Sequence, residues 1–267
     1  MEFSEATIRL SAFLAIFFAM AIYELWSPRL EREEMKGAWK SKRWFTNLSI
    51  VVISSVALRI IFPAAAVGTA LYAEENGWGL FPALGIPPSI AGIASFVILD
   101  FAVWLEHVVS HKVPLFWRFH RMHHADNGFD VTTALRFHPV EIVASMFWKA
   151  GIVIALGAPA VAVLIFEIVL NGTAMFNHSN IDLPQSLDRW LRRVVVTPDM
   201  HRVHHSSTPR ETDSNYGFNF PFWDRLFRTY NAQPERGHEG MEIGLKEYRG
   251  KQSAGLVWAL GLPFRRR

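Results

Sequence analysis

The sequence EHVVSHKVPLFWRFHRMHH, residues 106–124, contains five of the eleven histidines of the chain. His107 and His111 are four residues apart, so they share one face of a helix. The segment HRMHH (120–124) places three more histidines at positions i, i+3 and i+4, which also share a face. Neutral imidazole is the commonest metal ligand in proteins, whereas protonated imidazoles repel one another. The spacing therefore indicates a metal site.

A second segment, HRVHH (201–205), nearly repeats the first, and His178 lies between the two. The chain thus holds nine clustered histidines, whereas a zinc site uses three or four protein ligands. Nine imidazoles suit two metals with four or five ligands each. Each HxxHH segment can supply both metals, because its side chains project from one helical patch. His238, by contrast, stands alone in the sequence and is expected to be an ordinary solvent-exposed residue.

The composition indicates an integral membrane protein. Apolar residues make up 51% of the chain and charged residues 19%, and the apolar residues form long runs. The chain has no cysteine, which excludes disulfides, iron–sulfur clusters and thiolate–zinc sites. The net charge of +3 fits cytoplasmic loops that face anionic lipid, and no nucleic-acid partner is expected.

The distribution of charge predicts the topology. Apolar spans are expected near 7–26, 44–71 and 89–109. The loop 27–43 carries six Lys or Arg residues and is therefore assigned to the cytoplasm, with the N-terminus outside. The loop 72–88 has two glutamates and no lysine or arginine, as an external loop should. His107 and His111 then lie at the cytoplasmic end of the third span.

A broken apolar stretch follows at 139–177. Gly157-Ala158-Pro159 interrupts it near the middle, which predicts a hairpin of two helices of about fifteen to seventeen residues, at the lower limit for spanning. This turn returns His178 and HRVHH to the side of the first histidines. Lys149 and Glu167 are each nine residues from Ala158, and an antiparallel turn would let them pair.

These features predict an all-α membrane protein with about four transmembrane helices, one of them preceding the core bundle, and a short hairpin. A cytoplasmic, histidine-rich helical cap completes it. The whole chain, residues 1–267, is expected to form a single domain whose motif-bearing core covers about 93–230. Ferritin-like diiron carboxylate proteins need several inward-facing glutamates and two ExxH motifs, a set that this sequence lacks.

The order HxxxH, HxxHH, HxxHH in this membrane context resembles the integral-membrane fatty acid hydroxylase/sterol desaturase superfamily. Shorter segments are also similar to that family: RFHPVE (136–141), FNHSN (176–180), NYG (215–217) and WDRLFRTY (223–230). The resemblance implies a non-haem diiron site at the cytoplasmic face that uses O₂ to attack an unactivated C–H bond of a lipid. It implies these metal ligands: His107, His111, His120, His123, His124, His178, His201, His204 and His205.

Imidazole ligands usually donate their second N–H to a carboxylate or a carbonyl. By closeness in sequence, the candidate acceptors are Glu106, Asp126, Glu141 and Asp199; each is alternatively an ordinary surface or capping acid, and Asp199 can cap the helix of HRVHH. His138 matches the HP dipeptide of the family and is assigned as an outer residue or a minor ligand.

The expected reaction is O₂-dependent hydroxylation of a fatty acyl, sterol or ether lipid, with desaturation as the alternative. Iron can supply such an oxidant and zinc cannot, although zinc can replace iron in preparations. The sequence has no nucleotide-binding GxGxxG after a strand, so electrons are expected from a cytochrome b5, a ferredoxin or a reductase. Two other classes stay open: a zinc-dependent membrane hydrolase, because imidazole also binds zinc, and a metal transporter or store without catalysis. The lipid, the oxidised carbon and the oligomeric state are not defined by the sequence.

Overall fold

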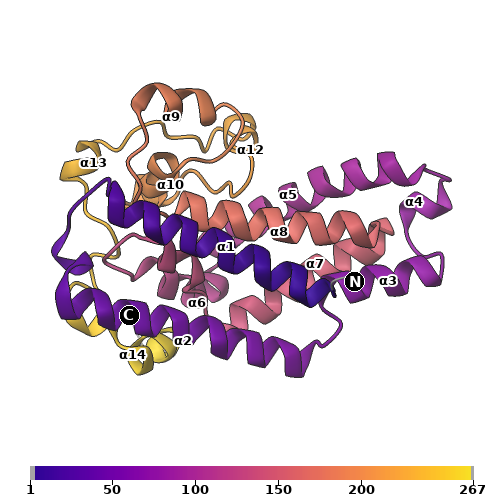
Figure 1. Ribbon diagram of the computed structural model, residues 1–267, viewed down its shortest axis with the longest axis horizontal. Helices are drawn as coiled ribbons and strands as arrows, with labels where there is room; N and C mark the ends of the chain where they lie inside the picture. The colour runs from indigo at the N-terminus through magenta and orange to yellow at the C-terminus, as the bar shows by residue number, and fades with distance from the viewer. Residues whose placement is uncertain (1–3, 266–267) are drawn as a thin grey trace.

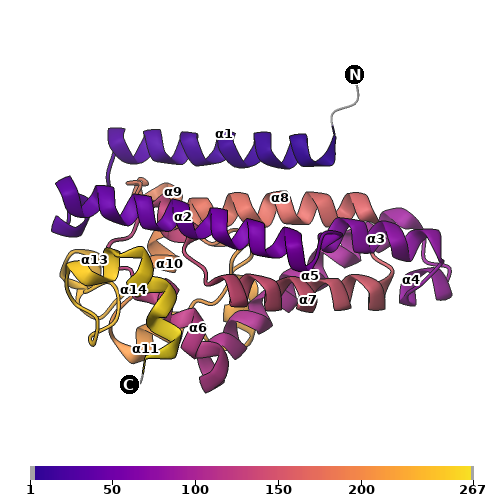
Figure 2. The ribbon, with the colours of Figure 1, turned by 90° about the horizontal axis from the view of Figure 1, so that it is seen from below.

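The long helices form a bundle. In the computed structural model, which describes residues 4–265, that part of the chain holds two isolated β-bridges and no β-strand, which confirms the all-α prediction. The expected domain limits, residues 1 and 267, lie outside the described residues. Figure 2 shows α1 as an outer layer that lies along α8 and α2. The long helices are α1 (Glu5–Trp26), α2 (Gly37–Ile61), α3 (Ala65–Glu75), α5 (Pro88–Lys112), α7 (Pro139–Leu156) and α8 (Ala160–Asn177).

Within residues 4–265, five helical segments are long and apolar enough to cross a membrane, by length and composition: Glu5–Trp26, Gly37–Ala83, Pro88–Lys112, Pro139–Leu156 and Ala160–Asn177. The expected count of about four is therefore not confirmed. The hairpin helices α7 and α8 have 18 residues each, which corresponds to about 27 Å of helix and nearly the thickness of the hydrocarbon core. The second segment is not a single helix, because it breaks at Pro63, between α2 and α3.

The hairpin turn between α7 and α8 depends on two glycines. Gly157 has φ +64°, a left-handed conformation that L-residues with side chains rarely adopt. A Cβ on Gly157 would lie 2.4 Å from the carbonyl oxygen of Trp78, and one on Gly79 would lie 2.0 Å from the Gly157 nitrogen. The turn therefore packs directly against the loop before α4 (Leu80–Ala83). The predicted reversal at Gly157 is confirmed.

The predicted ion pair inside the hairpin is also present. Lys149 Nζ lies 3.1 Å from Glu167 Oε1. Arg9 of α1 completes a triplet that no local sequence pattern predicted, since its Nη1 lies 2.6 Å from Glu167 Oε2. The triplet ties α1 to the hairpin, as expected for charges at membrane depth, which pair or face the interior.

Short helices and loops gather at one end of the bundle, where α1 ends and α2 begins (Figure 1). His238 lies here and is only 7% exposed, 3.6 Å from Asp199 Oδ2. The expectation that His238 faces solvent was therefore wrong, because the C-terminal segment folds back over the histidine region. The elements of this end are η1 (Glu33–Met35), α6 (Pro114–His124), η2 (Val131–Leu135), α9 (Gln185–Leu191), α10 (Pro198–His204), α11 (Pro209–Thr212), α12 (Phe222–Leu226), α13 (Gly237–Gly240), η3 (Lys251–Ala254), α14 (Leu256–Gly261) and η4 (Leu262–Phe264).

A buried ionic network fastens the loop after α6 to α2. Arg43 donates from Nε to Asp126 Oδ1 at 2.5 Å and from Nη2 to Asp126 Oδ2 at 2.9 Å. Its Nη1 donates to Asp130 Oδ2 at 2.9 Å. Gly128 lets the guanidinium approach, because a Cβ there would lie 2.3 Å from Arg43 Cζ. Burial alone would raise the pKa of Asp126, but Arg43 outweighs burial and lowers that pKa to about 2. The network holds the chain in place directly after HRMHH.

Replacing Arg43 should therefore destabilise the protein strongly. Arg43→Met leaves Asp126 and Asp130 buried without their cation, and we expect a loss of about 3–5 kcal/mol in the free energy of unfolding. The change is measured by thermal or denaturant unfolding in detergent. Arg59→Met, on an exposed position of the same helix, is the control and should change stability by less than about 0.5 kcal/mol. Equal stability of the two variants would contradict this role of Arg43.

Candidate metal centre

The structure brings the nine predicted histidines together in two adjoining groups. Within each group the candidate ligand atoms all lie within 4.8 Å of one another. The rings of His124 and His205, one from each group, stack with centroids 4.6 Å apart. The first group has five members and the second has four: His107, His111, His120, His124 and His204, and then His123, His178, His201 and His205.

Each HxxHH segment contributes to both groups. From α6, positions 120 and 124 join the first group and position 123 joins the second. From α10 and the residue after it, position 204 joins the first group while 201 and 205 join the second. Proline begins both helices at the first position, where its missing N–H is not needed. Because of the i, i+3, i+4 spacing, the three histidines of each HxxHH segment are thus divided between the two adjacent groups.

The distances between ring nitrogens within each group match those expected for histidines that bind one cation. His178 Nε2 lies 3.2, 3.1 and 3.2 Å from the Nε2 atoms of His123, His201 and His205. In the first group, the Nε2 atoms of His107 and His120 are 3.2 Å apart. Two nitrogens bound to one ion at about 2.0–2.1 Å would lie about 3.0–3.4 Å apart. The observed spacings fall in that range.

In the first group, the other ring nitrogens show that the contact between His107 and His120 is not an ordinary hydrogen bond. His107 Nδ1 donates to the carbonyl of Tyr216 at 2.7 Å, and His120 Nδ1 donates to the Glu141 carboxylate at 2.6 Å. A neutral ring that donates from Nδ1 carries its lone pair on Nε2. With Glu141 ionised, two lone pairs therefore face each other at 3.2 Å, an arrangement that a cation between them would stabilise.

Two further histidines of the site also donate a hydrogen bond from Nδ1 to a backbone carbonyl. His204 Nδ1 donates to the carbonyl of Ser214 and His178 Nδ1 to that of Ala174, both at 2.7 Å. The Nε2 atoms of His111, His124 and His204 are buried and have no hydrogen-bond partner in the part of the chain that the structure describes. Buried acceptors without a partner are rare in proteins, and a bound ion satisfies such atoms. The nine imidazoles thus have the donor chemistry and the geometry for two metal ions.

Burial keeps these histidines neutral. It lowers the pKa of His120 to about 3 and that of His178 to about 4. Burial, followed by the charges of neighbouring imidazoles, lowers the pKa of His123, His124 and His205 well below the ordinary value. Neutral imidazole is the form that binds a metal.

Of the four predicted carboxylate acceptors, only Glu141 contacts a clustered histidine by a hydrogen bond. Asp126 is occupied by Arg43. Asp199 forms an ion pair with Arg202, and the cap of α10 is Thr197, whose hydroxyl accepts from the Met200 N–H. Glu106 accepts a hydrogen bond from the Ser145 hydroxyl at 3.1 Å.

His138 lies outside both groups. Its Nδ1 accepts from the Val140 N–H at 3.2 Å and so caps α7, while its Nε2 lies 3.3 Å from the Leu260 carbonyl. Sequence reasoning also missed acceptors that this chain does use. The Asp213 carboxylate lies 3.4 Å from His111 Nδ1, and the carbonyls of Tyr216 and Ser214 serve His107 and His204.

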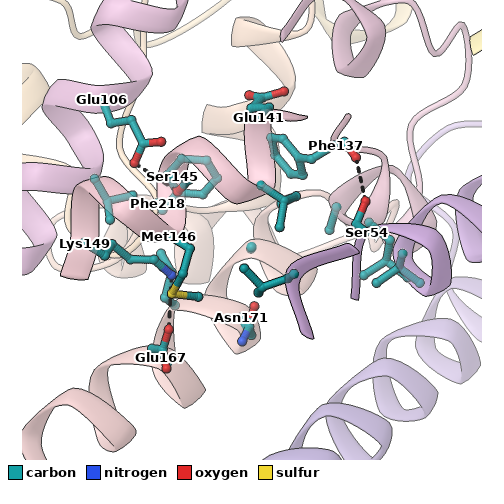
Figure 3. A pocket seen from close by; sticks show the side chains of 18 of the residues that line it. Ser54, Glu106, Phe137, Glu141, Ser145, Met146, Lys149, Glu167, Asn171 and Phe218 are labelled. Carbon is teal, nitrogen blue, oxygen red and sulfur yellow. Dashed lines mark hydrogen bonds and ion pairs between the residues drawn. The ribbon is translucent and has the colours of Figure 1, made fainter. Parts of the chain in front are cut away.

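A cavity of about 350 Å³ extends from His107 and His120 into the bundle, between α1, α2, α5, α7 and α8. In Figure 3, Glu106 and Glu141 lie toward one end and Lys149, Glu167 and Asn171 toward the other. Glu141 and Lys149 are eight residues apart on α7, about 12 Å along the helix axis. The volume is within the range of small-molecule sites.

A bundle of apolar helices long enough to span a membrane, with two buried groups of imidazoles at one end, defines a polyhistidine membrane protein whose two groups could each hold a metal ion. More specifically, the chain belongs to the fatty acid hydroxylase family, whose model matches residues 92–229, just over half of its length.

Relatives of known name support this assignment. The chain is 29% identical over 181 residues to ornithine lipid hydroxylase OlsE of Rhizobium tropici, which covers 68% of this chain and 52% of that protein. It is 28% identical over 227 residues to alkylglycerol monooxygenase of Xenopus tropicalis (82% and 47%) and 27% identical over 172 residues to cholesterol 25-hydroxylase of Rattus norvegicus (59% and 54%). The chain spans about half the length of these relatives. No solved structure gives a significant match.

The depressed histidine pKa values predict acid sensitivity of the metal-free protein. Between the folded pKa of about 4 for His178 and the ordinary value of 6.5, the unfolded chain binds the proton and the folded chain does not, so stability rises with pH. Acidification from pH 6.5 to 4 should therefore lower the free energy of unfolding, by about 3 kcal/mol for such a group, since one pKa unit is about 1.4 kcal/mol. Measurement of the free energy of unfolding of the metal-free protein across this pH range tests this prediction. Stability that is constant or greater at pH 4 would contradict the buried, neutral state.

The Glu141–His120 contact predicts a difference between two carboxylates of the same cavity. Glu141→Ala leaves the His120 N–H without its acceptor and should weaken metal binding about 10–100-fold. Glu106→Ala is the matched control, because Glu106 binds a serine hydroxyl, and should change metal affinity less than about twofold. Competition with a chelator of known affinity measures both. Equal weakening in the two variants would show that Glu141 has no particular role at the centre.

Proposed function

We propose that this protein hydroxylates an unactivated C–H bond of a lipid with O₂ at a non-haem diiron centre. The ligands would be the nine clustered histidines, five at one iron and four at the other. Family membership supports the reaction class, since relatives are named as lipid hydroxylases and monooxygenases. Hydroxylation is preferred to desaturation because the first motif is HxxxH.

The observation that carries the proposal is the pair of histidine groups with Nε2 atoms that face one another at 3.1–3.2 Å. Imidazole suits iron as well as zinc. Two bound irons would supply the redox chemistry that a C–H bond of a lipid chain requires and that zinc lacks.

The residues of the chain would orient the histidine ligands, hold the substrate and keep water away from the reacting carbon. Glu141 would fix the His120 ring, and the carbonyls of Tyr216 and Ser214 would fix His107 and His204. The cavity that begins at His107 and His120 would hold the substrate carbon next to the first histidine group. Its apolar walls would exclude water and protect the reacting species from side reactions.

The same proposal includes the domain organisation, the side of the membrane on which the histidines lie, and the source of electrons. The protein would be a single domain, 1–267, with its histidines on the cytoplasmic face, as the basic loop 27–43 indicates. Electrons would come from an external donor of the cytochrome b5, ferredoxin or reductase type. Trp117 is a suitable point of entry for these electrons. The centroid of its ring lies 5.0 Å from that of the His111 ring, and its side chain lines a hollow of about 660 Å³ at the surface of the cap.

The substrate would be a lipid of the fatty acyl, sterol or ether class. The relatives named above are an ornithine lipid hydroxylase, an alkylglycerol monooxygenase and a cholesterol 25-hydroxylase, so the family matches do not single out one of these classes.

Anaerobic purification with ferrous iron, followed by O₂ uptake with a reductant and total membrane lipid, tests the proposal. We expect two irons per chain and an O₂-dependent mass gain of one oxygen on a lipid. His201→Ala removes a ligand from the second group only and should lower the iron content toward one per chain. Loss of two hydrogens would identify a desaturase. Tight zinc without O₂ consumption under any reductant would overturn the oxidative function in favour of a hydrolase or a metal store.

A further inference from the structure

The end of the cavity that lies away from the histidines is ionic. Arg9, Lys149 and Glu167 all line it. The Glu167 carboxylate, 3% exposed, binds Arg9 through one oxygen and Lys149 through the other. Charges at membrane depth are costly unless paired or turned toward a cavity or the bundle interior. A hydrocarbon tail that ended against these three groups would leave their remaining hydrogen-bonding capacity facing apolar atoms.

The charges at this end balance. Arg9 also binds Glu5 Oε1 at 3.1 Å, so the two cations Arg9 and Lys149 stand against the two carboxylates Glu5 and Glu167. An additional anion or cation would enter without a free counter-charge. Glu106, on the cavity wall nearer the histidines, accepts a hydrogen bond from Ser145 and offers no positive charge to an anion. A neutral group that donates and accepts hydrogen bonds would not disturb this balance.

Polar groups remain available for such a partner. The Lys149 ammonium has three donors, and one of them is directed at Glu167. The Asn171 amide faces the cavity from α8, one turn from Glu167 (Figure 3), and has no hydrogen bond to another residue in 4–265. Between this end and the histidines, the walls include the apolar side chains Val51, Leu58, Val103, Met146 and Leu170.

We propose that the cavity binds an amphiphilic lipid in one orientation, with a neutral hydrogen-bonding group (a hydroxyl, ether or amide) at Arg9–Glu167–Lys149 and its hydrocarbon toward His107 and His120. This inference rests on the proposed lipid oxidation for the identity of the occupant. The ionic end then acts as a fixed stop about 12 Å, measured along the axis of α7, from Glu141, which contacts His120. The distance between the polar group and the reacting carbon is set by the protein.

Binding to the metal-free protein in neutral phospholipid nanodiscs tests the orientation. Decane, decanol and decyl sulfate share one chain, of a length that fits this spacing, and differ in the polar group. By competition or native mass spectrometry, decanol should bind about tenfold more tightly than decane, since it gains hydrogen bonds at the triplet. Decyl sulfate should bind more weakly than decanol, because its charge has no free partner.

Two variants should shift this selectivity in opposite directions. Glu167→Gln leaves an excess positive charge and should raise the affinity for decyl sulfate relative to decanol by about tenfold or more. Lys149→Gln leaves an excess negative charge and should lower that ratio. Arg59→Gln removes a cation from an exposed position of α2 that does not line the cavity, and it should leave the ratio unchanged.

The outcomes separate the alternatives. If decane binds as tightly as decanol, or if the two variants lower thermal stability without changing the ratio, the triplet is structural and the inference fails. The measurement needs neither metal nor turnover. If the protein consumes no O₂ but shows the predicted binding selectivity, the result therefore counts against the proposed reaction and not against the binding orientation.

Discussion

The structure depends on keeping nine imidazoles neutral and close together in a space from which water is excluded. The nitrogen lone pairs of His107 and His120 face each other at 3.2 Å, and three nitrogens surround that of His178 at 3.1–3.2 Å. Protonated rings would repel one another in both groups, and the facing lone pairs of His107 and His120 are unfavourable when those two rings are neutral. A cation in each group would make both arrangements favourable. The metal ions would therefore be part of the stability of this end of the protein as well as of its chemistry.

The surrounding elements are arranged to hold the rings from outside. Backbone carbonyls and the Glu141 carboxylate accept the Nδ1 protons of four rings, those of His107, His120, His178 and His204, and turn their Nε2 atoms inward. The Arg43–Asp126 ion pair anchors the loop that follows HRMHH. The glycine-dependent turn at Gly157 reverses the chain so that α8 delivers His178 to the histidines of α5 and α6. The cavity joins this end to the ionic triplet, so a molecule bound in it could contact both.

The helices and the nine clustered histidines could be predicted from the sequence, because apolar runs, breaks and i, i+3, i+4 spacings are local signals. The division of each HxxHH segment between two groups followed from helical geometry. The acceptors could not be predicted in the same way. Asp126 and Asp199 are close to the histidines in sequence, but cations that the fold brings from other turns and helices, Arg43 and Arg202, occupy them. The carbonyls of Tyr216 and Ser214 have no side-chain signal, and Arg9 meets Glu167 across 158 residues of sequence. The burial of His238 depends on the path of the C-terminal segment, which no periodicity indicates.

Anomalous diffraction at the iron absorption edge, from crystals of protein loaded anaerobically with ferrous iron, tests the two-metal centre most directly. We expect two iron peaks, one among His107, His111, His120, His124 and His204 and one among His123, His178, His201 and His205. A single peak, or iron bound away from these histidines, would contradict a diiron centre at this site.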